Sequence, residues 1–200
     1  MGNRIRLLFW TIAALLVLHS EAARADASAE SYVRAQHVEL MNLLAQPRNS
    51  SRDQKIGAVM DRVFDYDDLA RRSLAEDWTA RSQSERDEFK GLLEQLVKQS
   101  YRKHLDKTAG WDVTYGATTN LDGGARVPTT AKHKTDKRKE PVSIDYLMHE
   151  TKGQWRVYDV VIEGSSMVGN YQSQFRKIIR KKGFGELIAR MKRRLAKGSD

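Results

Sequence analysis

The stretch WRVYDVVIEGSSMVGNYQSQF, residues 155–175, passes from one hydrophobic period to another. In residues 155–163 apolar side chains occupy both alternating positions, which is typical of a strand with two apolar faces. Val168, Tyr171 and Phe175 then recur at helical spacing. A glycine and two serines separate the two patterns. The stretch therefore predicts a strand, a tight corner and a helix with an inward apolar side.

The corner itself has two interpretations, a hydrolase nucleophile or a helix cap. A nucleophile elbow requires G-x-S-x-G on a strand-to-helix turn. Here Gly164 begins the pattern, but Val168 stands where the second glycine is needed, and Gly169 comes one residue late. We therefore interpret Ser165 or Ser166 as the N-cap of a helix that begins near Met167.

Three more strands are expected before this corner, because the period of two extends back to residue 111. Turn signals separate them at Asp122-Gly123-Gly124 and at Lys152-Gly153, and a basic loop with Pro141 lies between the second and third. The four predicted strands are Trp111–Ala117, Arg126–His133, Val142–His149 and Trp155–Glu163.

Helices are expected on both sides of the strands. Residues 29–45 form the first, a capping box of Ser51 with Gln54 opens the second, and a short third helix runs through Leu69, Leu74 and Trp78. A capping box of Ser82 with Glu85 opens the longest helix, to about Leu105; Gly183 divides the helices after the sheet. The predicted fold class is α+β, a single domain with a four-stranded antiparallel sheet.

The N-terminus has the pattern of a secretory signal. Two arginines precede the apolar run 7–18, and Ala23-Arg24-Ala25 offers a small-x-small cleavage site. The run is shorter than a membrane span needs, so an uncleaved anchor is the weaker alternative. We predict a signal peptide over 1–25, a mature domain over 26–200 and, since the chain has no cysteine, a periplasmic location.

The formal net charge is +9, and it is concentrated in two segments. One is the loop from Lys132 to Lys139, and the other is the C-terminal segment from Arg176 to Lys197. Clustered cations indicate an anionic partner or serve solubility. An exported protein is not expected to meet nucleic acid, which leaves anionic lipid or acidic protein surfaces. A membrane-surface role for the basic tail, through Arg190, Lys192 and Arg193, is one alternative; packing of its apolar side in the core is the other.

Few residues suggest bond chemistry. The histidines lack zinc-ligand spacing, so no metal site is predicted, and no nucleotide-binding glycine motif occurs. Asp145 and Tyr146 on one strand, with Asp159 on the next, could form an acid–base set like that of an isomerase. The alternative is that these carboxylates make hydrogen bonds and ion pairs at the ends of the sheet. A sheet with two apolar faces must be covered on both or must line a cavity.

The motifs I144-D145-Y146, W155-R156-V157-Y158-D159-V160, E163-G164-x-S166 and N170-Y171-x-x-Q174-F175 resemble the MlaC family of periplasmic phospholipid-binding proteins. The resemblance extends to F64-D65, A70-R71, L74, W78 and F89 in the helical half. Gln172 stands where the family typically has arginine, Ser165 where it has an aliphatic residue, and the loop 132–139 is unusually basic.

The resemblance implies an NTF2-like fold whose curved sheet and helices enclose an apolar pocket. It implies a non-enzymatic carrier with no cofactor besides its phospholipid cargo; a hopanoid-type lipid is an alternative cargo. Its partners would be an outer-membrane lipoprotein–porin complex and an inner-membrane ABC transporter of the Mla type. An isomerase-type enzyme of the same architecture is the other alternative. The residues expected to line the pocket are Leu74, Val113, Tyr146, Val157, Val161 and Phe175.

Overall fold

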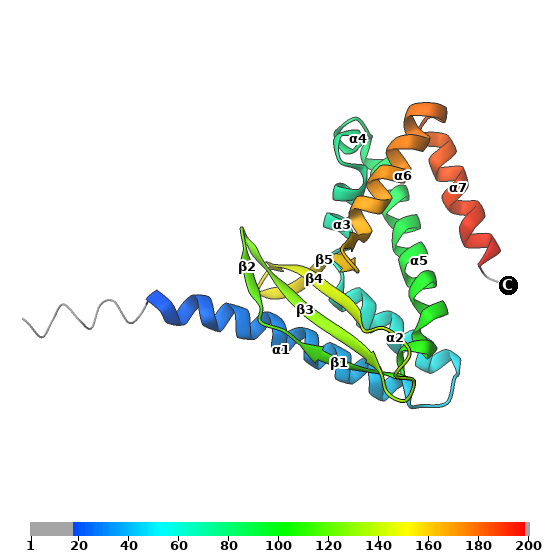
Figure 1. Ribbon diagram of the computed structural model, residues 1–200. Helices are drawn as coiled ribbons and strands as arrows, with labels where there is room; N and C mark the ends of the chain where they lie inside the picture. The colour runs from blue at the N-terminus through cyan, green and yellow to red at the C-terminus, as the bar shows by residue number, and fades with distance from the viewer. Residues whose placement is uncertain (1–17, 199–200) are drawn as a thin grey trace, which may run out of the picture.

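A computed structural model describes residues 18–198, without the side chains of 18–28 and 103–107, as seven helices and six strands (Figure 1). The helices are α1 Leu18–Leu44, α2 Ser50–Val63, α3 Tyr66–Leu74, α4 Glu76–Thr79, α5 Gln83–Thr108, α6 Met167–Lys182 and α7 Phe184–Lys197. The strands are β1 Trp111–Tyr115, β2 Thr119–Leu121, β3 Gly124–His133, β4 Val142–Thr151, β5 Gln154–Ile162 and β6 Ser165–Ser166. Helices therefore flank one continuous run of strands, which confirms the predicted α+β class.

The strands form one antiparallel sheet in the order β1-β3-β4-β5-β6. The short strand β2 also pairs with β3, as β1 does. Four of the six strands were predicted from the sequence. The prediction of a four-stranded sheet was wrong in number because β2 and β6 are only three and two residues long. Such short segments do not contain enough alternation to be recognised.

Two turns of this sheet require left-handed backbone. Lys152 and Gly153, between β4 and β5, have φ angles of 53° and 74°. Glu163 and Gly164, between β5 and β6, have φ angles of 49° and 74°. Two successive positive φ angles define the two-residue turn that matches the twist of antiparallel strands. The second turn reverses the chain directly before α6.

The helix starts agree with the sequence at one of the two predicted capping boxes. Ser82 and Glu85 form the box at the start of α5, with both reciprocal hydrogen bonds present. At α2 the prediction was wrong: Asn49, not Ser51, is the N-cap, and its side chain accepts a hydrogen bond from the Arg52 amide at 2.8 Å. Asparagine caps a helix as well as serine does, so the pattern allowed either start.

The third predicted helix is divided in two. Ala75 has a φ of 50°, so α3 ends at Leu74 and α4 is a separate turn that contains Trp78. A left-handed alanine cannot continue an α-helix. The apolar spacing through Leu69, Leu74 and Trp78 gave no sign of this break, because all three side chains still pack on one cluster.

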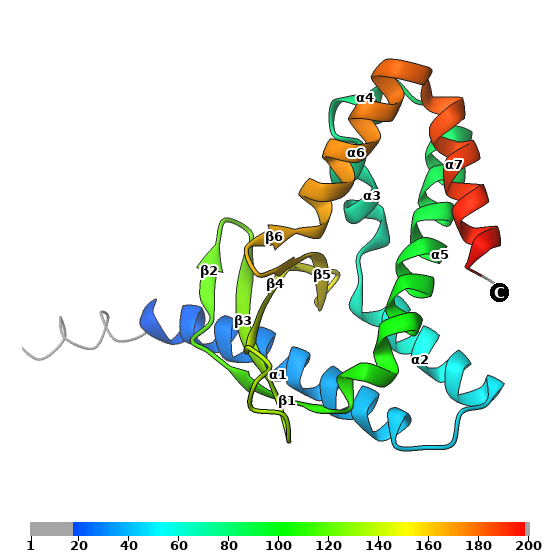
Figure 2. The same cartoon turned by 45° about the vertical axis from the view of Figure 1, so that its right-hand side comes forward.

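The helices gather in two places around the sheet. α1 runs along the sheet beside β3 and β2, and α2 and α3 meet β5 (Figure 1). Farther from the sheet, α6 packs between α3 and α7, and α5 lies beside α7 (Figure 2). The main core joins both places. Its buried members include residues of six helices and three strands: α1, α2, α3, α5, α6, α7, β3, β4 and β5. The helices and the sheet are thus one packed unit.

The basic C-terminal segment packs its apolar side in the core, which is the second of the two alternatives for it. α7 buries Phe184, Leu187, Ile188 and Met191. Within residues 18–198, no helix has both the length and the apolar character needed to cross a bilayer. Residues 1–17 of the predicted signal peptide lie outside the described residues, and the backbone of α1 passes through the predicted cleavage site. Cleavage after Ala25 stays a prediction.

Candidate binding site

Strand pairing assigns the side chains of the sheet to two faces. Tyr146 lies opposite Val127 on β3 and Val160 on β5, so these three side chains share one face. Asp145 lies opposite Pro128 and Val161, which therefore share the other. We call the face of Tyr146 the inner face, because Val127 and its neighbours belong to the main core, and the face of Asp145 the outer face.

The inner face stays buried along β3, from Ala125 to Ala131, and becomes more exposed on β4 and β5 toward the loop between β3 and β4. Val127, Met148 and Val157 are 0% exposed. Farther toward the loop between β3 and β4, Ile144 is half-buried, and its cross-strand partner Ile162 is 48% exposed. The chain thus leaves apolar sheet surface uncovered next to a fully packed floor. An uncovered apolar surface that continues a core is a feature of ligand-binding surfaces.

Tyrosine hydroxyls line the boundary between the buried and exposed parts. Burial, and secondly the neighbouring Tyr115, raises the pKa of Tyr146 to about 12. Burial and then Tyr146 raise the pKa of Tyr101, which reaches this region from α5. The hydroxyl of Tyr115 lies 3.0 Å from Nδ1 of His37 on α1. Burial, and then the charge of Lys134, lowers the pKa of His37. Neutral phenols of this kind combine an apolar ring with a polar tip.

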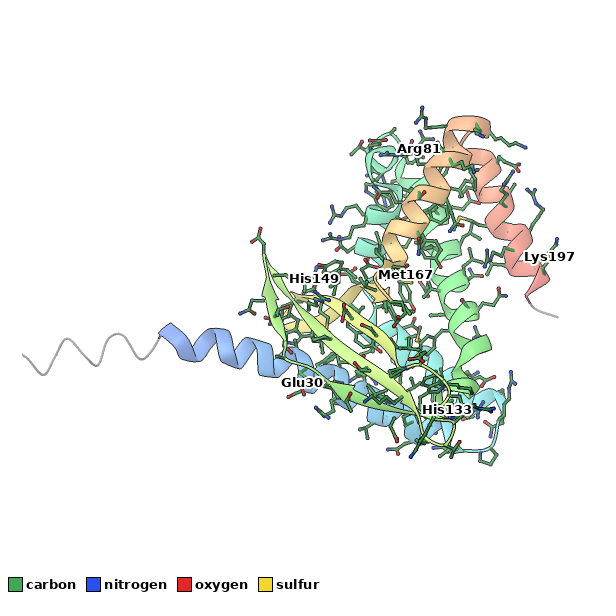
Figure 3. All side chains as sticks on the ribbon, in the orientation of Figure 1. Glu30, Arg81, His133, His149, Met167 and Lys197 are labelled. Carbon is green, nitrogen blue, oxygen red and sulfur yellow. The ribbon has the colours of Figure 1, made fainter. Side chains whose placement is uncertain are left out.

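Helix α6 forms a wall beside this face. The ring of Phe175 stacks on Tyr171 at 5.3 Å and meets Phe89 of α5 edge-on at 5.5 Å. Met167, which Figure 3 labels where the chain leaves the sheet, and Val168 pack against the same cluster. Aromatic side chains from α5 and α6 therefore join the sheet floor to the helical part of the molecule.

Four of the six residues predicted to line a pocket come together in this cluster. Leu74, Val157 and Phe175 are buried in it, and Tyr146 is half-buried against it. Val113 lies on the inner face too, opposite Ala131, but outside this cluster and nearer the loop between β3 and β4. Val161 lies on the outer face, opposite Asp145, and is not brought together with the others. Contact of any of the six with a ligand stays a prediction. Sequence reasoning did not select Tyr101 and Tyr115, since their spacing also fits ordinary core positions.

The corner after β5 is held by a carboxylate and a hydroxyl. Ser166 is the N-cap of α6, and its hydroxyl accepts a hydrogen bond from the Gly169 amide at 2.8 Å. The same hydroxyl donates to Oδ2 of Asp159 at 2.5 Å. Oδ1 of Asp159 accepts from the amides of Val160 and Val168. The hydroxyl is therefore used as a cap, and the prediction of a capping serine is confirmed.

The possible acid–base set is not assembled. Asp145 and Asp159 point to the outer face, whereas Tyr146 points to the inner face. Asp145 is 6% exposed and accepts two hydrogen bonds from the guanidinium of Arg126, at 2.5 and 3.1 Å. Both carboxylates thus have structural partners, which favours the alternative that they are ion-pair and hydrogen-bond residues.

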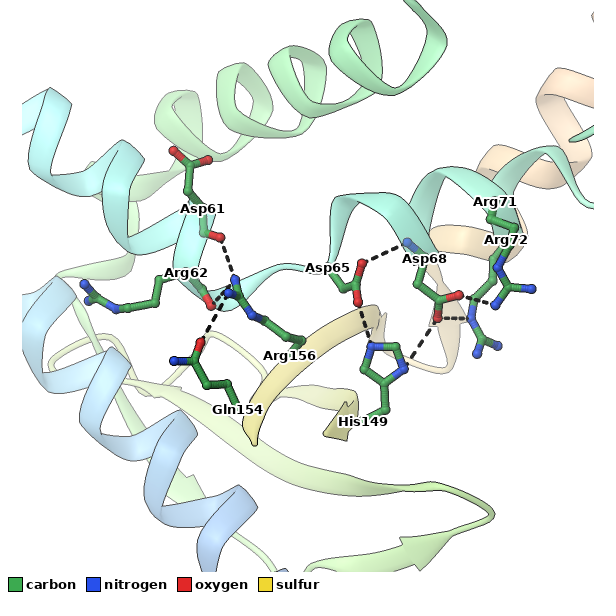
Figure 4. Close-up of polar contacts among 9 residues, drawn as sticks. All are labelled: Asp61, Arg62, Asp65, Asp68, Arg71, Arg72, His149, Gln154 and Arg156. Atoms are coloured by element: carbon green, nitrogen blue, oxygen red, sulfur yellow. Dashed lines mark hydrogen bonds and ion pairs between the residues drawn. The ribbon is translucent and has the colours of Figure 1, made fainter. Parts of the chain in front are cut away.

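A polar network joins α3 to the outer face of the sheet (Figure 4). Nε2 of His149 lies 2.8 Å from Asp65, and Nδ1 lies 3.7 Å from Asp68. Asp68 also accepts hydrogen bonds from Arg71 and Arg72. Burial opposes ionisation of Asp68, but these two hydrogen bonds hold its pKa below the usual value. No sequence pattern indicated this network, because His149 and Asp65 lie 84 residues apart.

No group of three or more histidine, aspartate or glutamate side chains with metal-binding geometry occurs in the part of the chain that the structure describes. The site therefore consists of apolar surface with tyrosine hydroxyls. This arrangement defines an α+β binding protein in which helices cover one apolar face of an antiparallel sheet only in part.

The particular family follows from comparison with known proteins. A family model described as MlaC protein matches residues 35–193, and the chain belongs to the MlaC family. A solved structure with the same fold is the phospholipid-binding protein from Ralstonia solanacearum in complex with a phospholipid. It is 21% identical, has a TM-score of 0.71 and covers 87% of this chain and 100% of its own. The family indicates a binding or transport protein rather than an enzyme.

Proposed function

We propose that this protein binds a phospholipid by its acyl chains on the inner face of the sheet and carries it through an aqueous compartment. The observation that carries the proposal is the inner face, which continues from a fully buried floor to exposed Ile162. The Ralstonia solanacearum structure supports it, because a protein of this fold is seen there with a phospholipid.

The energy of lipid transfer fits a carrier. Each buried CH₂ group contributes ~0.8 kcal/mol, so two chains of ~16 carbons lose on the order of 25 kcal/mol on entering water. A carrier must replace the bilayer with apolar protein surface and needs no catalytic group. The hydroxyls of Tyr101 and Tyr146 offer donors to ester or headgroup oxygens at the boundary of that surface.

Native mass spectrometry of the purified protein tests the proposal. The expected result is a co-purifying diacyl phospholipid; solvent extraction then identifies its class and separates it from a hopanoid-type lipid. A protein that stays empty even after incubation with phospholipid vesicles would overturn the proposal. An empty protein that turns over a small apolar substrate would support the isomerase alternative instead.

We also propose a periplasmic route between an outer-membrane lipoprotein–porin complex and an inner-membrane ABC transporter of the Mla type. Membership of the MlaC family supports it. The exported protein should begin at Asp26, which N-terminal sequencing checks. Crosslinking in cells should recover the transporter or the porin complex; recovery of neither from cells that contain both would contradict the route.

A further inference from the structure

The exposed side of α6 carries a row of cations, which we call the α6 basic stripe: Arg176, Lys177, Arg180 and Lys181. They line a hollow of about 550 Å³ together with Gly169, Gln172 and Ser173. The opposite side of the same helix packs Tyr171 and Phe175 in the core. The fold therefore fixes the stripe on the surface.

The cations of α6 have fewer carboxylate partners than those of α7. Glu186 pairs with Arg190 and Arg193, and Glu88 pairs with Lys192. In α6 only Arg176 forms an ion pair with a described residue, Glu76 at 2.7 Å. The sequence of α6 contains no acidic residue. Each tail position singled out from sequence thus has a carboxylate partner, whereas Lys177, Arg180 and Lys181 of α6 form no ion pair with a described residue.

This arrangement is unfavourable for the isolated helix. Arg176 with Arg180, and Lys177 with Lys181, are like charges four residues apart, which destabilise a helix. The helix dipole favours only the cations of the last turn, and Arg176 and Lys177 lie before it. An anionic surface that meets the stripe would relieve both repulsions at once.

We propose that the α6 basic stripe docks the protein on the anionic headgroups of a phospholipid membrane. A stable protein–protein interface has an apolar centre from which charged residues are depleted. The residues that line this hollow include no large apolar side chain. A charged bilayer surface needs no such centre, since each nearby Lys or Arg is attracted to it electrostatically. The stripe therefore fits a membrane better than an acidic protein.

Vesicle co-sedimentation of the full exported chain tests the proposal. Vesicles that contain phosphatidylglycerol are compared with vesicles of phosphatidylcholine alone. The wild-type protein should bind only the anionic vesicles, and should be released when NaCl is raised from about 0.05 to about 0.5 M, because the screening length shortens. The triple variant Lys177→Gln, Arg180→Gln and Lys181→Gln should bind on the order of 100-fold more weakly, at about fivefold per charge.

The matched control removes the same charge elsewhere. Lys132→Gln, Lys137→Gln and Lys139→Gln together neutralise three exposed cations, one near the end of β3 and two in the loop that follows it. This variant should keep wild-type vesicle binding within a few-fold. Equal losses in both triple variants would overturn the proposal, since they would report net charge alone. A wild-type protein that ignores anionic vesicles would also overturn it and leave an acidic protein surface as the partner of the stripe.

The docking proposal does not depend on cargo binding. If the wild-type protein carries no phospholipid in native mass spectrometry, the cargo proposal fails, and the vesicle measurement is still valid. If the α6 variant loses its co-purified lipid together with vesicle binding, the stripe belongs to the cargo site and the docking proposal is wrong. Thermal unfolding of both triple variants shows that each remains folded.

Discussion

Nε2 of His149, on strand β4, lies 2.8 Å from Oδ2 of Asp65, the residue that caps helix α3 (Figure 4). The Asp65 carboxylate thus contacts both β4 and α3, because its Oδ1 accepts a hydrogen bond from the Asp68 amide at 2.9 Å. The Asp65 amide in turn donates to the Val157 carbonyl on β5 at 2.9 Å. The start of α3 is therefore fixed to two strands at one residue. α3 then packs on α6, so this joint sets the position of the wall beside the inner face.

Removal of the imidazole should weaken this joint. His149→Ala leaves the Asp65 carboxylate without one partner, and we expect a loss of ~1–2 kcal/mol in the free energy of unfolding. Urea denaturation measures the loss. The control is Glu150→Ala, an exposed neighbour on the same strand, which should change stability by less than about 0.5 kcal/mol. Equal effects of the two variants would show that the joint has no stabilising role.

The Asp68 carboxylate should make stability fall at acid pH. Its folded pKa lies below the unfolded value, so its contribution is present above the ordinary carboxyl pKa of 3.8 and is lost as pH falls through the folded pKa. Asp68→Asn should therefore cost about 1 kcal/mol at neutral pH, a modest amount since both arginines are partly exposed and screened. Below the folded pKa the two proteins should converge.

The control for Asp68 is its neighbour on the helix. Asp67 is 80% exposed and pairs with Lys90, so Asp67→Asn should have little effect at any pH. His149 also faces Asp68, at 3.7 Å, and remains in both variants. Urea denaturation across the acid range gives the difference between wild type and each variant. A difference for Asp68→Asn that does not shrink with falling pH would contradict the assigned role.

Substitution of Ser165 and of Ser166 should change the free energy of unfolding by different amounts. Ser166→Ala removes the cap of α6 and the hydrogen bond to Asp159, and we expect a loss of ~0.5–2 kcal/mol in the free energy of unfolding. Ser165 is exposed, so Ser165→Ala is the matched control and should be close to neutral. Both variants should keep any co-purified lipid. Loss of lipid from a folded Ser166→Ala protein would place this serine in the binding site rather than at a cap.

The sequence predicted the elements that have a clear period and missed those that do not. The stretch 155–175 gave β5, the corner and α6, since apolar period and cap residues agree there. β2 and β6 were not predicted, because they are too short to show an alternation of apolar and polar residues. The break at Ala75 depends on a backbone angle that no neighbouring residue type indicates.

The sequence indicated that apolar strand residues would pack together, but it did not indicate on which face of the sheet each of them lies. Tyr146 and Val157 lie in one cluster, because buried apolar strands pack on helices. Val161 has the same residue type and the same strand as Val157, yet it lies on the outer face. A register shift between Leu147 and Met148 changes the alternation along β5. Such a bulge depends on pairing with β4, which the sequence of β5 alone does not contain.

The two faces provide a direct test of the cargo site. Ile144 and Val161 are both half-buried β-branched residues on adjacent strands, but Ile144 faces inward and Val161 outward. Ile144→Gln would bring an amide against acyl chains without a hydrogen-bond partner, which is costly. We expect several-fold less phospholipid per chain in native mass spectrometry. Val161→Gln adds the same amide on the other face and should keep the wild-type ratio, with thermal unfolding as the check that both variants fold. Equal retention in the two variants, or loss only from Val161→Gln, would contradict the assignment of the inner face as the lipid-binding surface.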